Sequence, residues 1–159
     1  MEVRERIALV IDFERRLGAD VIRSTPGIPA PSELRHRARL VLDEALELCE
    51  ALGVKVSLLG DDRDICKRPL KYETERPPDI VKVADSLNDI EYVVYGTVTS
   101  FGIQEATDEL FQEVHRSNLA KLESGIVRDG KPVKPAGWQP PDLRGILQRR
   151  FPKRALLFR

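Results

Sequence analysis

Apolar residues recur at intervals of three or four over four long segments of the chain, residues 2–17, 33–52, 80–101 and 107–122. This spacing places apolar side chains on one face of an α-helix. The segment 80–101 is apolar on nearly every side, which is typical of a central, buried helix. The pattern predicts an all-α fold of four main helices, with a short fifth helix around residues 143–150.

Capping residues mark the ends of these segments. We expect Ser32, Asp79 and Thr107 to be N-caps, because their side-chain oxygens can accept from amides that have no partner inside the helix. Gly53 and Gly102 follow the last apolar positions of two segments, where glycine commonly ends a helix.

The segments between the helices are irregular. Within residues 54–78, "VKVSLL" fits a short strand or a frayed helix end, and the remainder fits a loop. The segment also contains "KRPLK", a basic patch that fits a solvated loop or a phosphate contact. After residue 125, "RDGKPV" fits a turn or small hairpin, and "PAGWQPPDL" fits an extended stretch.

Composition excludes several classes of protein. The 26 basic and 26 acidic residues balance, so no overall positive field favours nucleic acid as a partner. Residues 144–159 are basic without any acid, which fits a solvated tail or, as a weaker reading, a nucleic-acid contact. No apolar run approaches the length needed to span a membrane. The two cysteines and the charged N-terminal stretch favour a reduced, cytoplasmic setting.

Carboxylates interrupt the apolar stripe of segment 33–52. Glu44 and Glu47 lie about 60° apart on a helix, on the side that also carries Leu40, Leu48 and Ala51, and Asp43 flanks them. Two like charges on a buried face raise each other's pKa and lose hydration. A bound divalent cation removes both costs; exposure to solvent or pairing with arginines are the alternatives.

Segment 80–101 carries a second acidic pair, Asp85 and Asp89, spaced i, i+4. Carboxylates that face one another across two helices form an oxygen-rich site. Such a site suits Mg²⁺ or Mn²⁺ better than zinc. Because Mg²⁺ in proteins usually takes substrate phosphates as further ligands, the pattern points to phosphate chemistry.

Residues 107–122 carry the donors that phosphate oxygens require. His115, Asn118 and Lys121 share one side of the predicted helix, and Arg116 points more to the side. We expect the same side to be anchored in the core by Phe111, Leu119 and Leu122. A buried hydrogen bond or a solvated helix end is the simpler interpretation for each polar residue taken alone.

Several stretches resemble the all-α nucleoside triphosphate pyrophosphohydrolase superfamily, which includes MazG, the phosphoribosyl-ATP pyrophosphohydrolases and the dimeric dUTPases. "DEALE" (residues 43–47) matches its acidic ExxE motif. "ADSLNDIEYVVYGT" (84–97), "EVHRSNLAKL" (113–122), "DGKPVKP" and "WQPPDL" resemble the phosphoribosyl-ATP pyrophosphohydrolase-like branch. The resemblance covers about residues 13–147 and implies a MazG-like helical domain over 1–147, followed by a basic tail over 148–159.

The resemblance implies Mg²⁺-dependent hydrolysis of a nucleoside triphosphate to the monophosphate and pyrophosphate, with dUTP or another deoxynucleotide favoured over phosphoribosyl-ATP. It implies that the acids Asp43, Glu44, Glu47, Asp85 and Asp89 hold the metal, that Glu47 and Glu44 are catalytic, and that His115, Arg116, Asn118 and Lys121 bind the phosphates. One departure is Ser86, which stands where the second acidic motif would place an acid. Another is the long stretch between Glu47 and Asp85, which implies an insertion loop over residues 54–78. The resemblance also implies a homodimer or homotetramer; a catalytically inactive helical interaction module is the competing reading.

Overall fold

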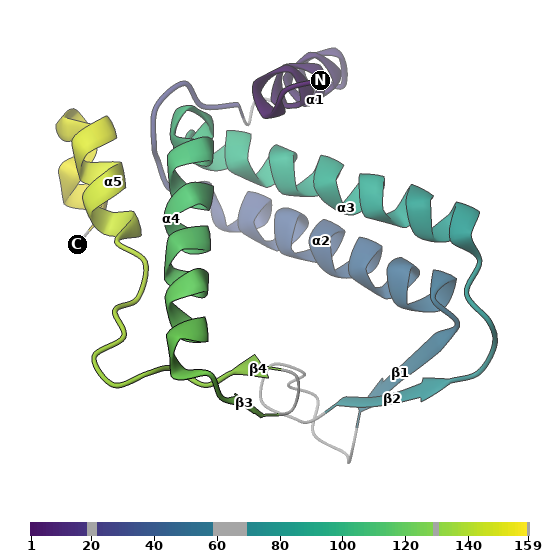
Figure 1. Ribbon diagram of the computed structural model, residues 1–159. Helices are drawn as coiled ribbons and strands as arrows, with labels where there is room; N and C mark the ends of the chain where they lie inside the picture. The colour runs from purple at the N-terminus through teal and green to yellow at the C-terminus, as the bar shows by residue number, and fades with distance from the viewer. Residues whose placement is uncertain (19–21, 59–69, 129–130, 159) are drawn as a thin grey trace. The chain divides into compact units, whose positions relative to one another are not determined.

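The computed structural model describes residues 1–18, 22–58, 70–128 and 131–158 (Figure 1). Its α-helices are α1 (Val3–Arg16), α2 (Pro31–Ala51), α3 (Ile80–Phe101), α4 (Thr107–Ala120) and α5 (Leu143–Arg150). Short 3-10 helices occupy Gln104–Ala106, Lys121–Ser124 and Pro152–Phe158. The all-α class is confirmed, and no helix in the described part is long and apolar enough to cross a membrane.

Two small antiparallel ladders accompany the helices. Strand β1 (Val54–Leu58) pairs with β2 (Leu70–Thr74), and β3 (Val127–Arg128) pairs with β4 (Lys131–Pro132). Of the two alternatives for "VKVSLL", the strand is found, over Val54–Leu58, and of the two for the segment after residue 125, the small hairpin is found. The interpretation of residues 70–74 as loop was wrong. Because four of the five side chains of β2 are exposed, its sequence lacks the alternation that marks a half-buried strand.

The chain divides into two compact units. Unit 1 comprises residues 1–28 and 98–159, and unit 2 comprises residues 29–97. Helix α3 contributes its first and longer part to unit 2 and its last turn to unit 1.

Unit 2 consists of α2, the β1–β2 ladder and most of α3. Because the two strands are antiparallel, α2 and α3 run in opposite directions (Figure 1). Gly53 ends α2 with a positive φ of 74°, and its carbonyl accepts from the amide of Glu75 at 2.8 Å. The amide of Asp79 donates to the carbonyl of Ala51 at 2.9 Å. These bonds tie the start of α3 to the end of α2.

Unit 1 is built around a core of small residues. Ile7 and Val10 of α1 are buried, and the fully buried side chains of largest volume are Thr99, Ser100 and Ser117. Buried Glu14 accepts a hydrogen bond of 3.2 Å from the Thr99 hydroxyl. Burial of such polar groups is tolerated because they are hydrogen-bonded.

The expected caps are partly corrected. Asp79 caps α3 as predicted, since its Oδ1 accepts from the amides of Val81 at 3.1 Å and Lys82 at 3.3 Å. Ser32 is not a cap, because α2 begins one residue earlier, at Pro31, which needs no amide partner there. Thr107 is also not a cap; it begins α4, and its hydroxyl donates to the carbonyl of Gln104 at 3.0 Å.

Helix α3 is not buried on all sides. Val81 is 75% exposed and Leu87 is 52% exposed. In the first part of α3 the side chains of Val83, Ser86, Ile90 and Val93 are covered and lie on one face, and full burial reaches other sides of the helix only from Tyr95 onward. Its all-round apolar pattern therefore exceeds what one copy of the chain covers.

Candidate active site

The five acids of the predicted metal site lie in unit 2, on α2 and α3. Burial raises the pKa of Glu44, and the negative charges of neighbouring carboxylates raise it further. In decreasing order of effect, these neighbours are Glu47, Asp89, Asp43 and Asp85. The two helices therefore bring all five carboxylates into one electrostatic neighbourhood, centred on Glu44.

Glu44 is the most enclosed member of this carboxylate cluster. It lies half-buried in a stripe with Leu40 and Leu48, whereas the other four acids are exposed. Arginine pairing is found at Asp43, whose Oδ2 lies 3.9 Å from Nε of Arg39. Over the described residues, no lysine or arginine forms an ion pair with the other four acids. Arginine neutralisation therefore applies to one acid only.

The cluster has the donor chemistry of a site for a hard divalent cation, because carboxylate oxygens are the ligands that Mg²⁺ and Mn²⁺ prefer. Burial and the neighbouring carboxylates both disfavour the charged form of Glu44 and so raise its pKa, and a bound cation would offset both effects. Among the residues with described positions, no three His, Cys, Asp or Glu side chains are already gathered within reach of one ion. The donors fit a metal by type and charge, and coordination requires the four exposed carboxylates to turn toward an ion near Glu44.

Substitution of Glu44 by glutamine should stabilise the metal-free protein at pH 7. A carboxyl whose folded pKa is raised favours folding while it is protonated. This contribution is fully present below the unfolded pKa of 4.5 and is lost as the pH rises through the folded value. The gain should stay below about 1 kcal/mol, because Glu44 is partly solvated. Thermal unfolding in excess chelator measures it, and a lower melting temperature for Glu44→Gln at pH 7 would argue against repulsion at this site.

An open pocket of about 370 Å³ lies in unit 2, along the carboxylate cluster. Its polar lining residues are Glu47, Glu50, Arg76, Lys82, Asp85 and Ser86. Arg76 and Lys82 were not predicted from the sequence. Lys82 could have been recognised, because it precedes Asp85 and Ser86 by one helical turn. Arg76 follows a strand that was not predicted, so the sequence carried no signal for it.

Ser86, the departure from the acidic motif, lies on the buried side of α3 and is 7% exposed. Asp85 is exposed, and it has the smallest effect of the four neighbours on the pKa of Glu44. Asp85, one residue before the motif position, therefore belongs to the cluster but affects the pKa of Glu44 least.

The predicted phosphate-binding residues lie in unit 1, on α4 and the turn that follows. His115 and Asn118 are exposed. Arg116 donates from Nε and Nη2 to Glu113, at 2.7 and 2.6 Å. Lys121 donates to Oδ1 of Asn118 at 2.6 Å. Part of their donor capacity is thus used within the chain.

The expected anchoring of this side of α4 in the core is wrong for the single chain. Phe111 is 73% exposed, and Leu119 and Leu122 are also exposed. The buried position on α4 is Ser117, which is 1% exposed. A small residue is buried there because the proline-rich stretch lies close against it.

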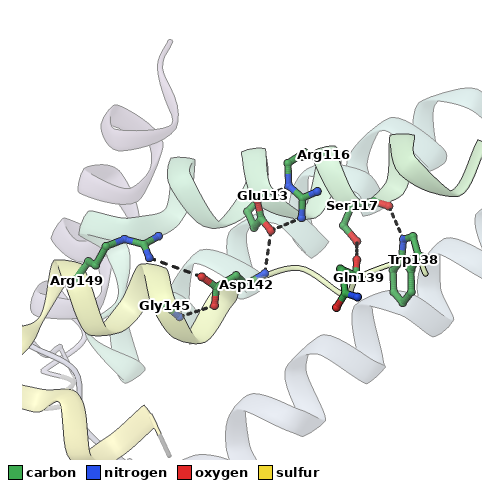
Figure 2. Close-up of polar contacts among 8 residues, drawn as sticks. All are labelled: Glu113, Arg116, Ser117, Trp138, Gln139, Asp142, Gly145 and Arg149. Atoms are coloured by element: carbon green, nitrogen blue, oxygen red, sulfur yellow. Dashed lines mark hydrogen bonds and ion pairs between the residues drawn. The ribbon is translucent and has the colours of Figure 1, made fainter. Parts of the chain in front are cut away.

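That stretch, residues 138–142, is fixed to α4 (Figure 2). The indole of Trp138 donates to the carbonyl of Ser117 at 3.0 Å, and the Ser117 hydroxyl donates to the carbonyl of Gln139 at 3.2 Å. The amide of Asp142 donates to Oε1 of Glu113 at 2.8 Å. Oδ1 of Asp142 in turn accepts from the amide of Gly145 at 2.8 Å, as the N-cap of α5. The extended conformation was predicted, but its attachment through Glu113 was not.

Acidification should detach this stretch. The hydrogen bonds from Arg116 and from the Asp142 amide lower the pKa of Glu113 to about 2. A depressed carboxyl pKa stabilises the fold above the unfolded value of 4.5, and this is lost as the pH falls toward 2. Fluorescence of Trp138, the only tryptophan, should therefore change between about pH 4.5 and pH 2.

The matching variant is Glu113→Gln, which should already show the altered Trp138 signal and a lower melting temperature at neutral pH. Glu123→Gln is the control, because Glu123 is an exposed acid just beyond α4. If Glu113→Gln kept the wild-type acid transition, another group would be responsible for it.

Comparison with known proteins gives the family. The chain matches the family described as phosphoribosyl-ATP pyrophosphohydrolase over residues 10–118, more than half of its length. A search of curated proteins found no match. The chain belongs to this family and is a nucleotide pyrophosphohydrolase, an enzyme that hydrolyses phosphoanhydride bonds. Enzymes of the family generally use a divalent metal. The matched span includes all five acids of the cluster.

Proposed function

We propose that this member of the phosphoribosyl-ATP pyrophosphohydrolase family hydrolyses a nucleoside triphosphate to the monophosphate and pyrophosphate with Mg²⁺, at the carboxylate cluster of unit 2. The family gives the class of reaction. The location is supported by the five acids that α2 and α3 bring into one neighbourhood, where burial and then the charges of four carboxylates raise the pKa of Glu44. Carboxylates crowded in this way repel one another, which lowers the stability of the fold. A bound cation would remove this repulsion.

The cluster would hold the cation through Glu44, Glu47, Asp85 and Asp89, with Asp43 as an auxiliary ligand. When bound, Mg²⁺, or Mn²⁺ in its place, offsets negative charge on the phosphate oxygens. We assign Glu47 as general base because it is exposed and lines the pocket. Its carboxylate takes a proton from water as the water oxygen bonds to phosphorus. The phosphoanhydride bond between the α- and β-phosphates breaks, and pyrophosphate leaves with the bonding electrons.

We assign His115, Arg116, Asn118 and Lys121 to binding of the phosphate chain. Exposed His115 donates to an anionic oxygen when it is protonated, and the Asn118 amide nitrogen is a donor at any pH. Arg116 has five N–H donors, of which Glu113 takes two, so it keeps the capacity to bind a phosphate.

A panel of nucleotides with Mg²⁺ tests the proposed substrate. It should include dUTP, the other deoxynucleoside and ribonucleoside triphosphates, and phosphoribosyl-ATP, with monophosphate, pyrophosphate and orthophosphate separated by chromatography. We expect pyrophosphate and monophosphate from a deoxynucleotide, at a kcat/KM at least about tenfold above that for phosphoribosyl-ATP. The opposite preference would assign the chain to phosphoribosyl-ATP. No turnover of any nucleotide would support an inactive interaction module, the reading that Ser86 favours.

We also propose that the chain assembles as a homodimer or homotetramer in the cytoplasm. Large apolar side chains stay exposed on α3 and α4 of the single chain, among them Val81, Leu87, Phe111 and Leu119. Apolar surface left exposed in each unit supports an interface with further copies of the chain. The free thiol of Cys49 suits a reducing compartment. Light scattering coupled to size-exclusion chromatography measures the assembly, and a monomer at micromolar concentration would contradict it.

A further inference from the structure

We propose that Arg76 and Lys82 form a binding site for phosphate oxygens in the pocket of unit 2 that Glu47 and Asp85 also line. The ligand class is a pyrophosphate group accompanied by a divalent cation, either as the terminal phosphates of the nucleotide or as the released product. This inference rests on the proposed function and deepens it, because it places a cationic subsite beside the carboxylate cluster and inside the same unit.

The lining of the pocket fits such a ligand. Three carboxylates, those of Glu47, Glu50 and Asp85, share the pocket with two cations and the hydroxyl of buried Ser86. A purely acidic pocket would bind a cation and repel a phosphate. The carboxylates of the pocket can bind the divalent cation, and its two basic side chains can bind phosphate oxygens. A pyrophosphate with its divalent cation therefore matches the pocket in charge.

Arg76 is positioned by the end of α2. Its Nη2 donates to the carbonyl of Glu50 at 2.7 Å and lies 3.8 Å from the Glu50 carboxylate. That carbonyl is one of the last of α2, where helix carbonyls lack partners within the helix. The hydrogen bond uses one of five N–H donors, and the side chain is 44% exposed. The guanidinium is therefore held in place while further donors remain for a ligand.

The Lys82 side chain does not stabilise the described part of the chain through any polar contact. No ion pair or hydrogen bond of its ammonium group is found among the described residues, and its side chain is exposed. It lies in the first turn of α3, one helical turn before Asp85 and Ser86. Lys82 thus lines the same pocket as Asp85 and Ser86, and its ammonium group pairs with neither of them.

Titration calorimetry of the full chain with pyrophosphate in millimolar Mg²⁺ tests the site. We expect wild type to bind, and Arg76→Gln and Lys82→Gln each to raise Kd by about tenfold, the loss typical of one charge-assisted hydrogen bond. Arg35→Gln and Lys71→Gln are matched controls, because both remove an exposed cation of unit 2 outside the pocket. Their Kd should stay within about twofold of wild type.

The outcomes separate this proposal from the proposed function, because pyrophosphate binding is measured without turnover. If nucleotides are hydrolysed but both variants bind pyrophosphate like wild type, the subsite is wrong and the hydrolase stands. If no nucleotide is hydrolysed but pyrophosphate binding still depends on Arg76 and Lys82, the cationic subsite is supported and the proposed hydrolysis is not. Absence of pyrophosphate binding by wild type would overturn the proposal. Should Arg76→Gln fail to fold, Lys82→Gln decides, because the Lys82 side chain makes no hydrogen bond or ion pair among the described residues and its backbone amide bond to Asp79 is kept.

Discussion

Glu47→Gln is expected to lower kcat by about 10²–10⁴-fold, the range that a positioned general base contributes. Glutamine keeps the size and shape of the side chain but cannot accept the proton from the attacking water. It also removes one negative charge from the carboxylate cluster, so the Mg²⁺ concentration needed for half-maximal activity should rise. KM for the nucleotide at saturating Mg²⁺ should change less than kcat, since Glu47 is not assigned to phosphate binding.

Steady-state pyrophosphate release by both proteins, at several Mg²⁺ concentrations, measures these effects. Glu73→Gln is the matched control, because Glu73 is a partly exposed acid on β2 that pairs with Lys71 and does not line the pocket. It should retain wild-type kcat. A Glu47→Gln variant with wild-type kcat at saturating Mg²⁺ would remove Glu47 from the role of base.

Gly53→Ala is expected to cost at least about 2 kcal/mol of stability. The backbone of Gly53 has φ of 74°, a left-handed conformation that costs other residues roughly 1–2 kcal/mol. A Cβ atom there would also lie 2.0 Å from the carbonyl oxygen of Arg76, which must therefore shift. For a chain of this length the loss corresponds to a fall in melting temperature of about 4–8 °C. The shift of Arg76 should also weaken pyrophosphate binding.

Gly125→Ala separates the two causes. Gly125 has a similar φ of 63°, but an added Cβ meets nothing within 4 Å. This variant should lose only the conformational part, about 1–2 kcal/mol, and should bind pyrophosphate like wild type. Equal losses in melting temperature for the two variants would mean that the contact with Arg76 relaxes without cost.

The sequence was sufficient for the helices and for the acids. Periodicity located α2, α3 and α4 to within two residues at each end, because each combines a helical repeat with a clear stop. The common side of Glu44 and Glu47 on α2 followed from helix geometry alone, and the influence of four acids on Glu44 agrees with it. Local rules succeed here because these residues belong to single helices.

The sequence was not sufficient where distant segments meet. Arg76 enters the pocket only because the β1–β2 ladder returns the chain to the end of α2, and β2 carries no alternating pattern. Glu113 could not be paired with Asp142 from periodicity, because 29 residues separate them. Apolar positions such as Phe111 were assigned to the core because a pattern does not distinguish a core from a surface that another chain covers.

If the five carboxylates form the divalent-cation site of the enzyme, Mg²⁺ must stabilise the fold through them. A Mg²⁺ titration of melting temperature, with wild type and Glu44→Gln in parallel, tests it most directly. A ligand at 100 times its Kd stabilises a protein by about 2.7 kcal/mol, so wild type should gain roughly 5–10 °C at saturation. Glu44→Gln should start at an equal or higher temperature without metal and gain much less with it, so that the two curves cross. Parallel curves, or no effect of Mg²⁺ on wild type, would contradict the account.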